Sequence, residues 1–152
     1  MFVKIACHMT MQIRPMLETD LPAVLALWGR TEGVGLNESD TPPRLAAYLC
    51  RNPGASFVAC DGVQGALLGA VLCGNDGRRG YLHHLAVAAE ARCQGIGRSL
   101  VQACLEQLAK LDIAKCNFFV YATNTPGRAF WEKLGWFGRD DLLTMQILIG
   151  GV

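Results

Sequence analysis

The sequence predicts a mixed α/β fold, a single sheet with helices on both of its faces. Three observations support this prediction. Stretches with the period of a strand alternate with stretches with the period of a helix, three strand-like runs follow one another across glycine turns, and one long amphipathic helix comes after them. The 152 residues are 51% hydrophobic and 18% charged, which suits one buried core and excludes intrinsic disorder.

The first half of the chain is expected to form a strand, two helices and a three-stranded meander. Residues 11–16 alternate apolar and polar side chains, as a half-buried strand does. Thr19 or Asp20 can cap a first helix, and Thr41, followed by two prolines, can start a second. Their inward side chains are expected to be Leu21, Val24, Leu25, Leu27 and Trp28, then Leu45, Tyr48 and Leu49. Glycine turns separate the three predicted strands, 56–60, 66–73 and 81–87.

The second half is expected to form a helix, a strand, a short helix and a last strand. The helix over 95–111 places Leu100, Cys104, Leu108 and Leu111 along one stripe. The remaining elements are predicted over 117–121 as a buried strand, 126–134 as a helix that ends at a glycine, and 142–149 as the final strand.

Charge and cysteine content exclude several classes of protein. Duplex nucleic acid requires clustered lysines and arginines, which a net charge of +1 does not supply, so we expect no nucleic-acid partner. Seven scattered cysteines without a C-x-x-C pair indicate neither a disulfide framework nor a zinc site. No apolar run approaches the roughly 18 residues of a membrane span. We expect a cytoplasmic protein without a metal, one domain over 11–152, and an N-terminal arm or alternative start over 1–10.

Residues 85–100 contain the most informative motif, a Leu-Ala-Val strand that leads through a glycine turn into the long helix. The unpaired N–H groups and the positive dipole end at the N-terminus of a helix bind phosphate. Gly95 and Gly97 allow a ligand to approach the backbone, and Arg92 and Arg98 add positive charge. The sequence therefore predicts a site for a phosphate-bearing ligand.

Two common nucleotide motifs fit these residues poorly. A P-loop requires glycine in place of Arg92 and lysine in place of Arg98, and a dinucleotide fingerprint requires glycine in place of Leu100. The Arg-x-x-Gly-x-Gly pattern resembles instead the cofactor signature of the GNAT superfamily of acyl-CoA N-acyltransferases. Residues 124–136, an Asn followed by Ala-Phe-Trp-Glu-Lys-Leu-Gly-Trp, resemble its second signature. The order of predicted elements also matches, and a nucleotide-binding domain remains as a weaker alternative.

The resemblance implies a mostly antiparallel sheet with one splayed parallel pair of strands, and acetyl-CoA as the acyl-donor cosubstrate. The pyrophosphate would lie on the N–H groups of the glycine turn, and the pantetheine would pair with the Leu-Ala-Val strand as an added strand. A backbone N–H near Leu85 would polarise the thioester carbonyl. The implied cofactor-binding residues are Leu85, Ala86, Val87, Arg92, Cys93, Gln94, Gly95, Ile96, Gly97, Arg98, Ser99, Asn124 and Trp131. A tight turn at the glycines and a helix cap at Asn124 are the purely structural alternatives.

A proton must leave the amine during direct acetyl transfer, and His83 is the candidate base because imidazole titrates near neutral pH. Strand alternation places Tyr81, His83 and Leu85 on one face and His84 on the other, with Ala86. A structural role is the alternative for both histidines.

A conventional acid for the departing CoA thiolate is missing. Family members usually place tyrosine where this chain has Trp131, and an indole N–H does not titrate usefully. Tyr121, on the predicted strand, or Tyr81 could replace it, or the thiolate could leave unprotonated.

The first interpretation is an N-acetyltransferase that moves the acetyl group directly to a primary amine of a small molecule or peptide in a ternary complex. The alternative is a catalytically weak acyl-CoA-binding sensor or regulatory module, which Trp131 favours. The loop 31–40 and the second helix are expected to recognise the acceptor, with Glu32, Glu38 and Asp40 either attracting a cationic amine or facing solvent. Residues 136–137 and the apolar residues 147–152 predict a homodimer through an exposed edge, or inward packing.

Overall fold

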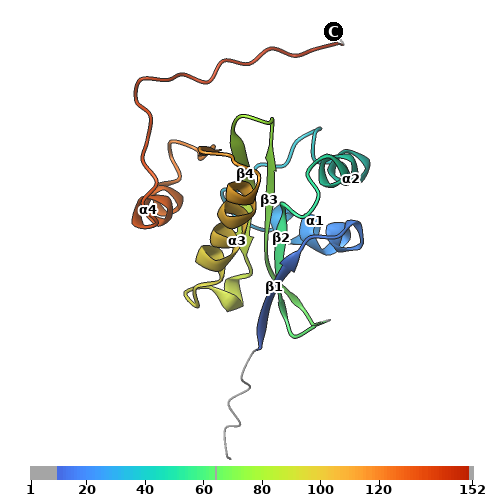
Figure 1. The fold of residues 1–152 in the computed structure, drawn as a ribbon. Helices are drawn as coiled ribbons and strands as arrows, with labels where there is room; N and C mark the ends of the chain where they lie inside the picture. Colours follow the sequence, from blue (N-terminus) through green and yellow to red (C-terminus); the bar gives the residue numbers. More distant parts are fainter. Residues whose placement is uncertain (1–9, 64, 151–152) are drawn as a thin grey trace, which may run out of the picture. The chain divides into compact units, whose positions relative to one another are not determined.

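The computed structural model describes residues 10–63 and 65–150, so most of the expected N-terminal arm lies outside the described residues. The chain divides into two compact units, one ending at Tyr121 and one beginning at Ala122. The larger unit contains the strands β1 Met11–Pro15, β2 Phe57–Asp61, β3 Leu67–Asn75, β4 Gly80–Val87 and β5 Cys116–Phe118. They form one sheet in the order β1-β2-β3-β4-β5 (Figure 1).

The sheet is mixed, as predicted. β1 to β4 pair antiparallel with their neighbours, whereas β5 pairs parallel with β4. The strand predicted over 117–121 is shorter and lies earlier, because only Cys116–Phe118 form ladder hydrogen bonds. Tyr121 therefore follows β5 instead of lying on it.

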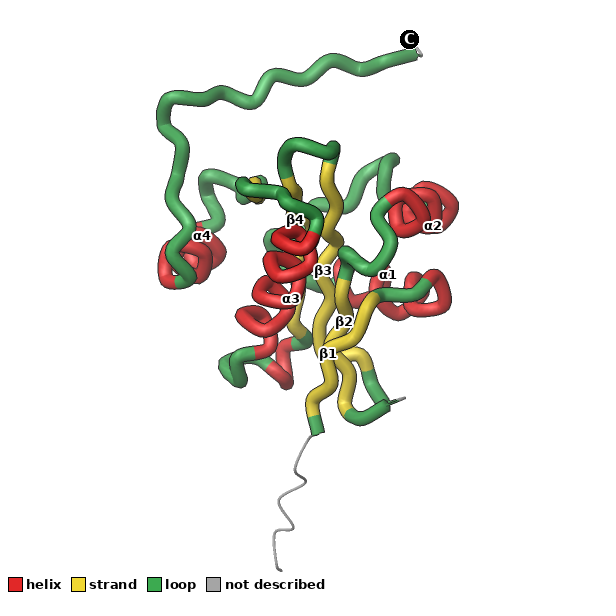
Figure 2. The backbone as a smooth tube through the Cα atoms, viewed as in Figure 1, coloured by secondary structure: helices red, strands yellow, loops and turns green. Residues whose placement is uncertain are grey.

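Three α-helices cover the two faces of this sheet. α1 Leu21–Gly29 and α2 Pro42–Arg51 lie on one face, and α3 Ile96–Lys110 lies on the other (Figure 2). Glycines in the sheet permit the close approach of the helices. A Cβ on Gly80 would overlap Leu108 of α3, and a Cβ on Gly74 would overlap the Tyr48 hydroxyl of α2. Two short 3-10 helices, Glu18–Asp20 and Ala89–Ala91, precede α1 and α3.

The core lies between these helices and the central strands. Helical spacing puts Leu100, Cys104 and Leu108 of α3 on the sheet, and all three are buried, as predicted. Leu111 was expected on the same stripe, but it follows the helix and remains half exposed. The buried side chains of α1 are Leu21, Val24, Leu27 and Trp28. Burial of such large apolar side chains supplies most of the free energy that favours folding.

Asp20 does not cap α1 with its side chain, contrary to expectation. Its carboxylate accepts two hydrogen bonds from the Arg14 guanidinium, each 2.7 Å long, and one from the Leu17 N–H. This bidentate pair connects β1 to the turn before α1. It holds the pKa of Asp20 below its ordinary value, chiefly through the hydrogen bonds from Arg14.

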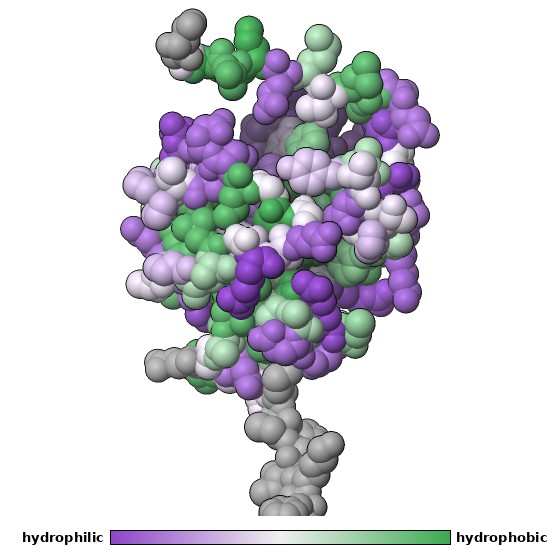
Figure 3. Space-filling model, turned by 180° about the vertical axis from the view of Figure 1, so that it is seen from behind, coloured by the Kyte–Doolittle hydropathy of each residue, from purple (hydrophilic) through white to green (hydrophobic). Residues whose placement is uncertain are grey.

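The smaller unit contains α4 Thr125–Lys133, close to the predicted helix. The strand predicted over 142–149 is absent, because these residues form no ladder and follow an irregular path. Their apolar side chains are exposed, and the last of them appear green beside the grey C-terminal atoms in Figure 3. Apolar alternation creates a strand only where a partner supplies the hydrogen bonds. Among the described residues no helix has both the length and the apolar character needed to cross a bilayer.

Candidate functional site

β4 contains a β-bulge where the Leu-Ala-Val motif begins. Ala70 and Leu72 are two residues apart in β3, whereas their partners Ala86 and His83 are three residues apart in β4. The additional residue is accommodated at His84, whose φ of 53° lies in the left-handed region. A non-glycine residue pays about 1–2 kcal/mol for this conformation, so its surroundings must hold it there.

The bulge overturns the predicted distribution of side chains between the two faces. Ala86 lies on the same face as His83, because their partners in β3 share a face. His84 also lies on the α1 and α2 side of the sheet. Its ring is 5.0 Å from that of the buried Trp28 in α1, and the His83 ring is 6.4 Å from Tyr48 in α2. Strict alternation holds only in a regular strand, and here one residue is inserted.

A hydrogen bond holds the bulge residue to the loop after α1. His84 Nε2 lies 2.8 Å from Asp40 Oδ1, and the second carboxylate oxygen accepts the Asn37 N–H at 2.9 Å. Both side chains are well shielded, with 16% of His84 and 8% of Asp40 exposed. A carboxylate only accepts, so Nε2 carries the proton and donates it. Asp40 is thus occupied by His84, whereas Glu32 and Glu38 are exposed.

His83 lies among aromatic rings at the middle of β4. Tyr81 and Phe119 stack with it at centroid distances of 6.4 and 6.5 Å, and Tyr48 meets it edge-on at 6.4 Å. Burial lowers the pKa of His83 below its ordinary value, and the neighbouring His84 lowers it further. The neutral, proton-accepting form of His83 is therefore favoured at neutral pH.

The edge of β4 beyond Leu82 has no strand partner among the described residues. β5 pairs only with Gly80 to Leu82, although β4 continues to Val87. Backbone groups on this side of residues 83–87, apart from the Val87 carbonyl that accepts from Arg92, are consequently available to an added extended ligand. This free edge leads through the second 3-10 helix directly to the glycine turn.

The glycine turn presents an uncapped helix N-terminus. Gly95 is the N-cap of α3 with a φ of 80°, which glycine adopts without strain, and no side chain caps the helix. The Gly95 carbonyl accepts both the N–H and the hydroxyl of Ser99, at 3.0 and 3.1 Å. Arg92 Nε donates to the Val87 carbonyl at 3.2 Å, which joins the turn to the end of β4. The first N–H groups of α3 have no intrahelical acceptor.

Side-chain exposure in the turn suits an anion site. The exposed residues are Arg92, Cys93, Gln94, Gly95 and Arg98; Gly97 and Ser99 are half-buried, and Ile96 is buried. The buried Ile96 joins the core, so it fixes the helix start while its neighbours face outward.

The second predicted signature lies in the smaller unit. Asn124 Oδ1 accepts the Gly127 N–H at 3.0 Å, so the side chain caps α4. Trp131 is buried, with its ring 4.8 Å from Trp136 and 5.3 Å from Phe130. The residues of this signature thus have a structural role within the smaller unit. The cap uses Oδ1 of Asn124, and the amide nitrogen of that side chain takes no part in it.

Neither tyrosine considered as an acid belongs to the unpaired part of β4, residues 83–87. Tyr121 is 58% exposed, and its hydroxyl occupies the space that a Cβ on Gly35 would need. The Tyr81 hydroxyl donates to Asp76 in the β3–β4 turn at 3.4 Å. Tyr121 thereby approaches the loop 31–40, and Tyr81 points toward the turn.

Sequence reasoning did not assign a site role to Tyr48 or Phe119, whose rings contact His83, or to Trp28, whose ring contacts His84. Aromatic side chains at helical spacing signal only burial, so no local pattern distinguishes them from core residues. Within the described ranges no group of three or more acidic, cysteine or histidine side chains could hold a metal ion.

Comparisons with known proteins agree with this geometry. Residues 21–136 match the acetyltransferase (GNAT) family. An acetyltransferase from Yersinia enterocolitica is 27% identical over 139 residues, covering 91% of this chain and 96% of that protein. The structure of PaiA N-acetyltransferase from Thermoplasma acidophilum in complex with coenzyme A superposes with a TM-score of 0.74 at 20% identity, covering 87% of this chain and 92% of that one. Ard1 from Thermoplasma volcanium gives a TM-score of 0.72 at 17% identity, with 82% and 81% covered. The chain belongs to the GNAT acetyltransferase family.

Proposed function

We propose that this protein is an acetyl-CoA-dependent N-acetyltransferase that transfers the acetyl group directly to a primary amine of a small molecule or peptide. One observation carries the proposal: the unpaired edge of β4 over residues 83–87 runs straight into the uncapped N-terminus of α3. An extended pantetheine suits the first feature and a pyrophosphate suits the second. The coenzyme A bound to the Thermoplasma acidophilum relative supports the same cosubstrate.

Acetyl-CoA would be held mainly by backbone groups. Leu85, Ala86 and Val87 would pair with the pantetheine, while the N–H groups of residues 94–99 would receive the pyrophosphate. The side chains of Arg92 and Arg98 are exposed in the turn and would supply positive charge. We assign Asn124, through its amide nitrogen, and Trp131 to the pantetheine arm on the basis of the family signature.

The bulge would supply the electrostatic part of catalysis. The amine nitrogen attacks the thioester carbonyl carbon, and negative charge develops on the carbonyl oxygen. An N–H at Leu85, next to the bulge, would donate to that oxygen. The Asp40–His84 hydrogen bond would act indirectly, by holding the bulge residue in its left-handed conformation.

His83 would take the proton from the amine, directly or through a water molecule. Its neutral form is favoured by burial, and it lies on β4 beside the proposed pantetheine edge. The C–S bond then breaks, and the CoA thiolate leaves. Tyr121 is the proposed proton donor to that thiolate, because Trp131 occupies the position where the family usually has tyrosine.

The second candidate is a catalytically weak sensor or regulatory module that binds acyl-CoA. Trp131 favours it, because an indole cannot protonate a thiolate. Both candidates require the same acetyl-CoA site and differ in turnover. A sensor would bind acetyl-CoA and release no CoA with any amine in a broad panel.

Calorimetric titration of acetyl-CoA tests the cofactor site that both candidates share. Saturable binding is expected for the wild type and is expected to be lost in the Gly95→Glu, Gly97→Glu double variant. Because Gly95 has a positive φ, the single variant Arg98→Glu serves as an unstrained second test and should weaken binding. Circular dichroism verifies that each variant is folded. A folded wild type that does not bind acetyl-CoA at about millimolar concentration contradicts the proposal.

We propose further that residues 11–152 function as one domain, in the cytoplasm and as a homodimer. The free thiols of Cys50, Cys60, Cys73, Cys93, Cys104 and Cys116 support a reducing compartment.

A further inference from the structure

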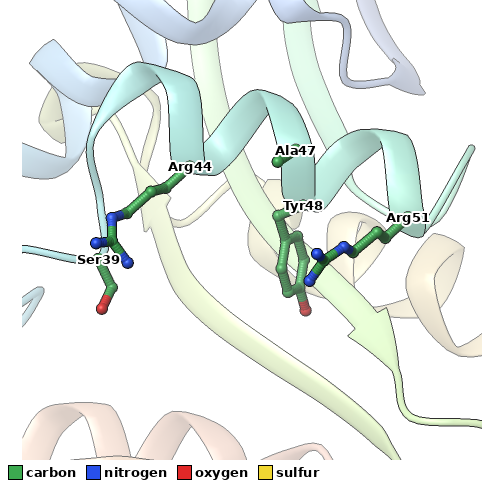
Figure 4. A pocket seen from close by; sticks show the side chains of 5 residues that line it. All are labelled: Ser39, Arg44, Ala47, Tyr48 and Arg51. Atoms are coloured by element: carbon green, nitrogen blue, oxygen red, sulfur yellow. The ribbon is translucent and has the colours of Figure 1, made fainter. Parts of the chain in front are cut away.

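A pocket of about 320 Å³ lies along α2 on the same side of the sheet as the two histidines. It is lined by Ser39, Arg44, Ala47, Tyr48 and Arg51. Figure 4 shows Arg44, Tyr48 and Arg51 projecting from one side of the helix, with the Arg51 guanidinium beside the Tyr48 ring and the Arg44 side chain extending toward Ser39. Their spacing of four and three residues places them on one helical face. A cavity of this size suits a small ligand.

The polar groups that line the pocket favour an anion. Arg44 and Arg51 bring two permanent positive charges, Ser39 and Tyr48 bring hydroxyl groups, and no carboxylate lines the cavity. Among the described residues neither guanidinium takes part in an ion pair. The fork of N–H donors on arginine matches the geometry of carboxylate and phosphate groups.

The two loop carboxylates that flank Ser39 in the sequence, Glu38 and Asp40, do not line the cavity. Asp40 follows Ser39 directly, but its two oxygens accept from His84 and from the Asn37 N–H. Glu38 is exposed, so among the described residues the charged side chains that line the pocket are the two arginines. This differs from one of the two alternatives that the sequence left open, in which the loop carboxylates attract a cationic amine, and it is compatible with the other, in which they face solvent.

Tyr48 connects the pocket to the proposed transfer site. Its ring lines the pocket and also meets the His83 ring edge-on at 6.4 Å. Burial raises the pKa of the Tyr48 hydroxyl, which therefore stays protonated and able to donate a hydrogen bond to an anion. Tyr48 thus belongs both to the lining of the pocket and to the aromatic surroundings of His83.

We infer that the acetyl acceptor is a small primary amine that also carries a carboxylate or phosphate group. This inference rests on the proposed acetyltransferase function. The anionic group binds Arg44 and Arg51 with hydrogen bonds from the Ser39 and Tyr48 hydroxyls, and the amine reaches the region of His83 and the β4 bulge. The pocket selects the acceptor by charge, and the histidine strand carries out the transfer.

Matched pairs of acceptors test the selection. Phosphoethanolamine is compared with ethanolamine, and β-alanine with β-alaninamide, in an assay of CoA release from acetyl-CoA. We expect kcat/KM to be at least about 10-fold higher for at least one anionic member than for its uncharged partner. The two pairs also distinguish phosphate from carboxylate. Equal rates within both pairs, with measurable transfer, would overturn the inference and leave the proposed function intact.

Variants of the two arginines test whether the preference for an anionic acceptor depends on the pocket. Arg44→Gln and Arg51→Gln should each raise the KM for the preferred anionic acceptor about 10- to 100-fold, with little change for its uncharged partner. Lys110→Gln is the control, because it removes one exposed charge from α3 on the opposite face of the sheet. A peptide with an acidic residue beside its N-terminus, if acetylated faster than every small anionic amine, would overturn the assignment to small molecules.

A binding experiment tests the pocket without turnover. Inorganic phosphate is titrated calorimetrically into the wild type and into the Arg44→Gln, Arg51→Gln double variant, both with excess CoA present. Saturable binding that the double variant loses and Lys110→Gln retains supports the anion site. Equal binding by wild type and double variant, or none by either, overturns it. Failure of the proposed function would appear separately, as failure to bind acetyl-CoA.

Discussion

His84 and Asp40, 44 residues apart in the sequence, are joined by a hydrogen bond of 2.8 Å between Nε2 and Oδ1. His84 is the residue of β4 that adopts a left-handed φ of 53°. The bond therefore connects the loop after α1 to the one strained position of the strand. A contact that offsets backbone strain at a bulge also fixes the direction of the neighbouring N–H groups.

The first prediction concerns Asp40→Ala. Without its acceptor, His84 can leave the left-handed conformation, and the N–H proposed to polarise the thioester would be misplaced. Loss of one such donor costs about 10²- to 10³-fold, so a partial displacement should lower kcat at least about 10-fold. The KM for acetyl-CoA should change by less than about threefold, because the pyrophosphate site is untouched. Steady-state kinetics measures both.

Two further variants show whether the loss of activity comes from the missing hydrogen-bond acceptor or from the missing charge. Asp40→Asn keeps an oxygen that can accept from His84 and should recover much of the activity. Glu38→Ala removes an exposed carboxylate two residues away and should leave kcat unchanged. If Glu38→Ala and Asp40→Ala lowered kcat equally, the loss would reflect the charge of the loop and not the bulge.

The second prediction concerns His83 as the proton acceptor. His83→Ala should lower kcat about 10²-fold, the usual size of general-base catalysis, while calorimetry shows unchanged acetyl-CoA affinity. In the wild type, kcat/KM should rise with pH and level off at a pH below about 6.5, because burial lowers the pKa of His83 from its ordinary value. An unchanged rate in His83→Ala would exclude this residue from proton transfer.

The third prediction is the effect of His83 on stability. A histidine with a lowered pKa stays neutral in the folded state while the unfolded chain is protonated. The free energy of unfolding should therefore fall as the pH decreases below about 6.5, and the fall should end below the folded-state pKa. Urea unfolding of wild type and His83→Gln between pH 4 and 8, a range of roughly four units around that value, measures it. A wild type and a variant with parallel pH dependence would contradict the shift.

Local patterns predicted the parts of the site that a few neighbouring residues determine. The Leu-Ala-Val strand, the glycine turn and α3 were predicted correctly. Each of them depends on residues that are close together in the sequence: the apolar run of a strand, the glycine that adopts a positive φ at position 95, and the apolar spacing of a helix. The bulge was not foreseen. It depends on the register of β4 against β3, and no pattern within β4 indicates that its residues 84 and 85 will oppose the single residue 71 of β3.

The residues around the two histidines could not be predicted from local sequence patterns either. Asp40, Tyr48 and Phe119 come from a loop, a helix and the segment after β5, and only the folded sheet brings them to His83 and His84. The incorrect strand over 142–149 has a related cause. Its composition favours β structure, but a strand requires a partner that the pattern of one segment cannot specify.

The fourth prediction concerns the proton donor to CoA. Tyr121→Phe should lower kcat about 10-fold if its hydroxyl protonates the thiolate, with acetyl-CoA binding preserved. Its hydroxyl lies against Gly35, so the loop 31–40 should keep its position when only that atom is removed. Trp131→Phe is the comparison, because neither indole nor phenyl can act as an acid. Unchanged kcat in Tyr121→Phe would mean that the thiolate leaves unprotonated or takes its proton from solvent.

The fifth prediction concerns the ion pair between Arg14 and Asp20, which joins β1 to the start of α1. Asp20→Asn should lower the free energy of unfolding by about 1–2 kcal/mol at pH 7, since the pair is bidentate but partly exposed. The pKa of Asp20 is lowered in the folded state, so this contribution is fully present above the ordinary value of about 3.9. It should disappear as the pH falls through the folded-state pKa.

Denaturant unfolding of wild type and Asp20→Asn at pH 7, and at lower pH values down to about 2, therefore gives two curves that converge in acid. Asp141→Asn is the matched control, because Asp141 also pairs with an arginine but is exposed at the surface of the smaller unit. Its removal should leave the free energy of unfolding unchanged within experimental error, because solvent screens an exposed pair. Curves for Asp20→Asn that stay parallel to the wild type down to the lowest pH would show that packing of the amide, and not loss of the paired charge, destabilises the variant.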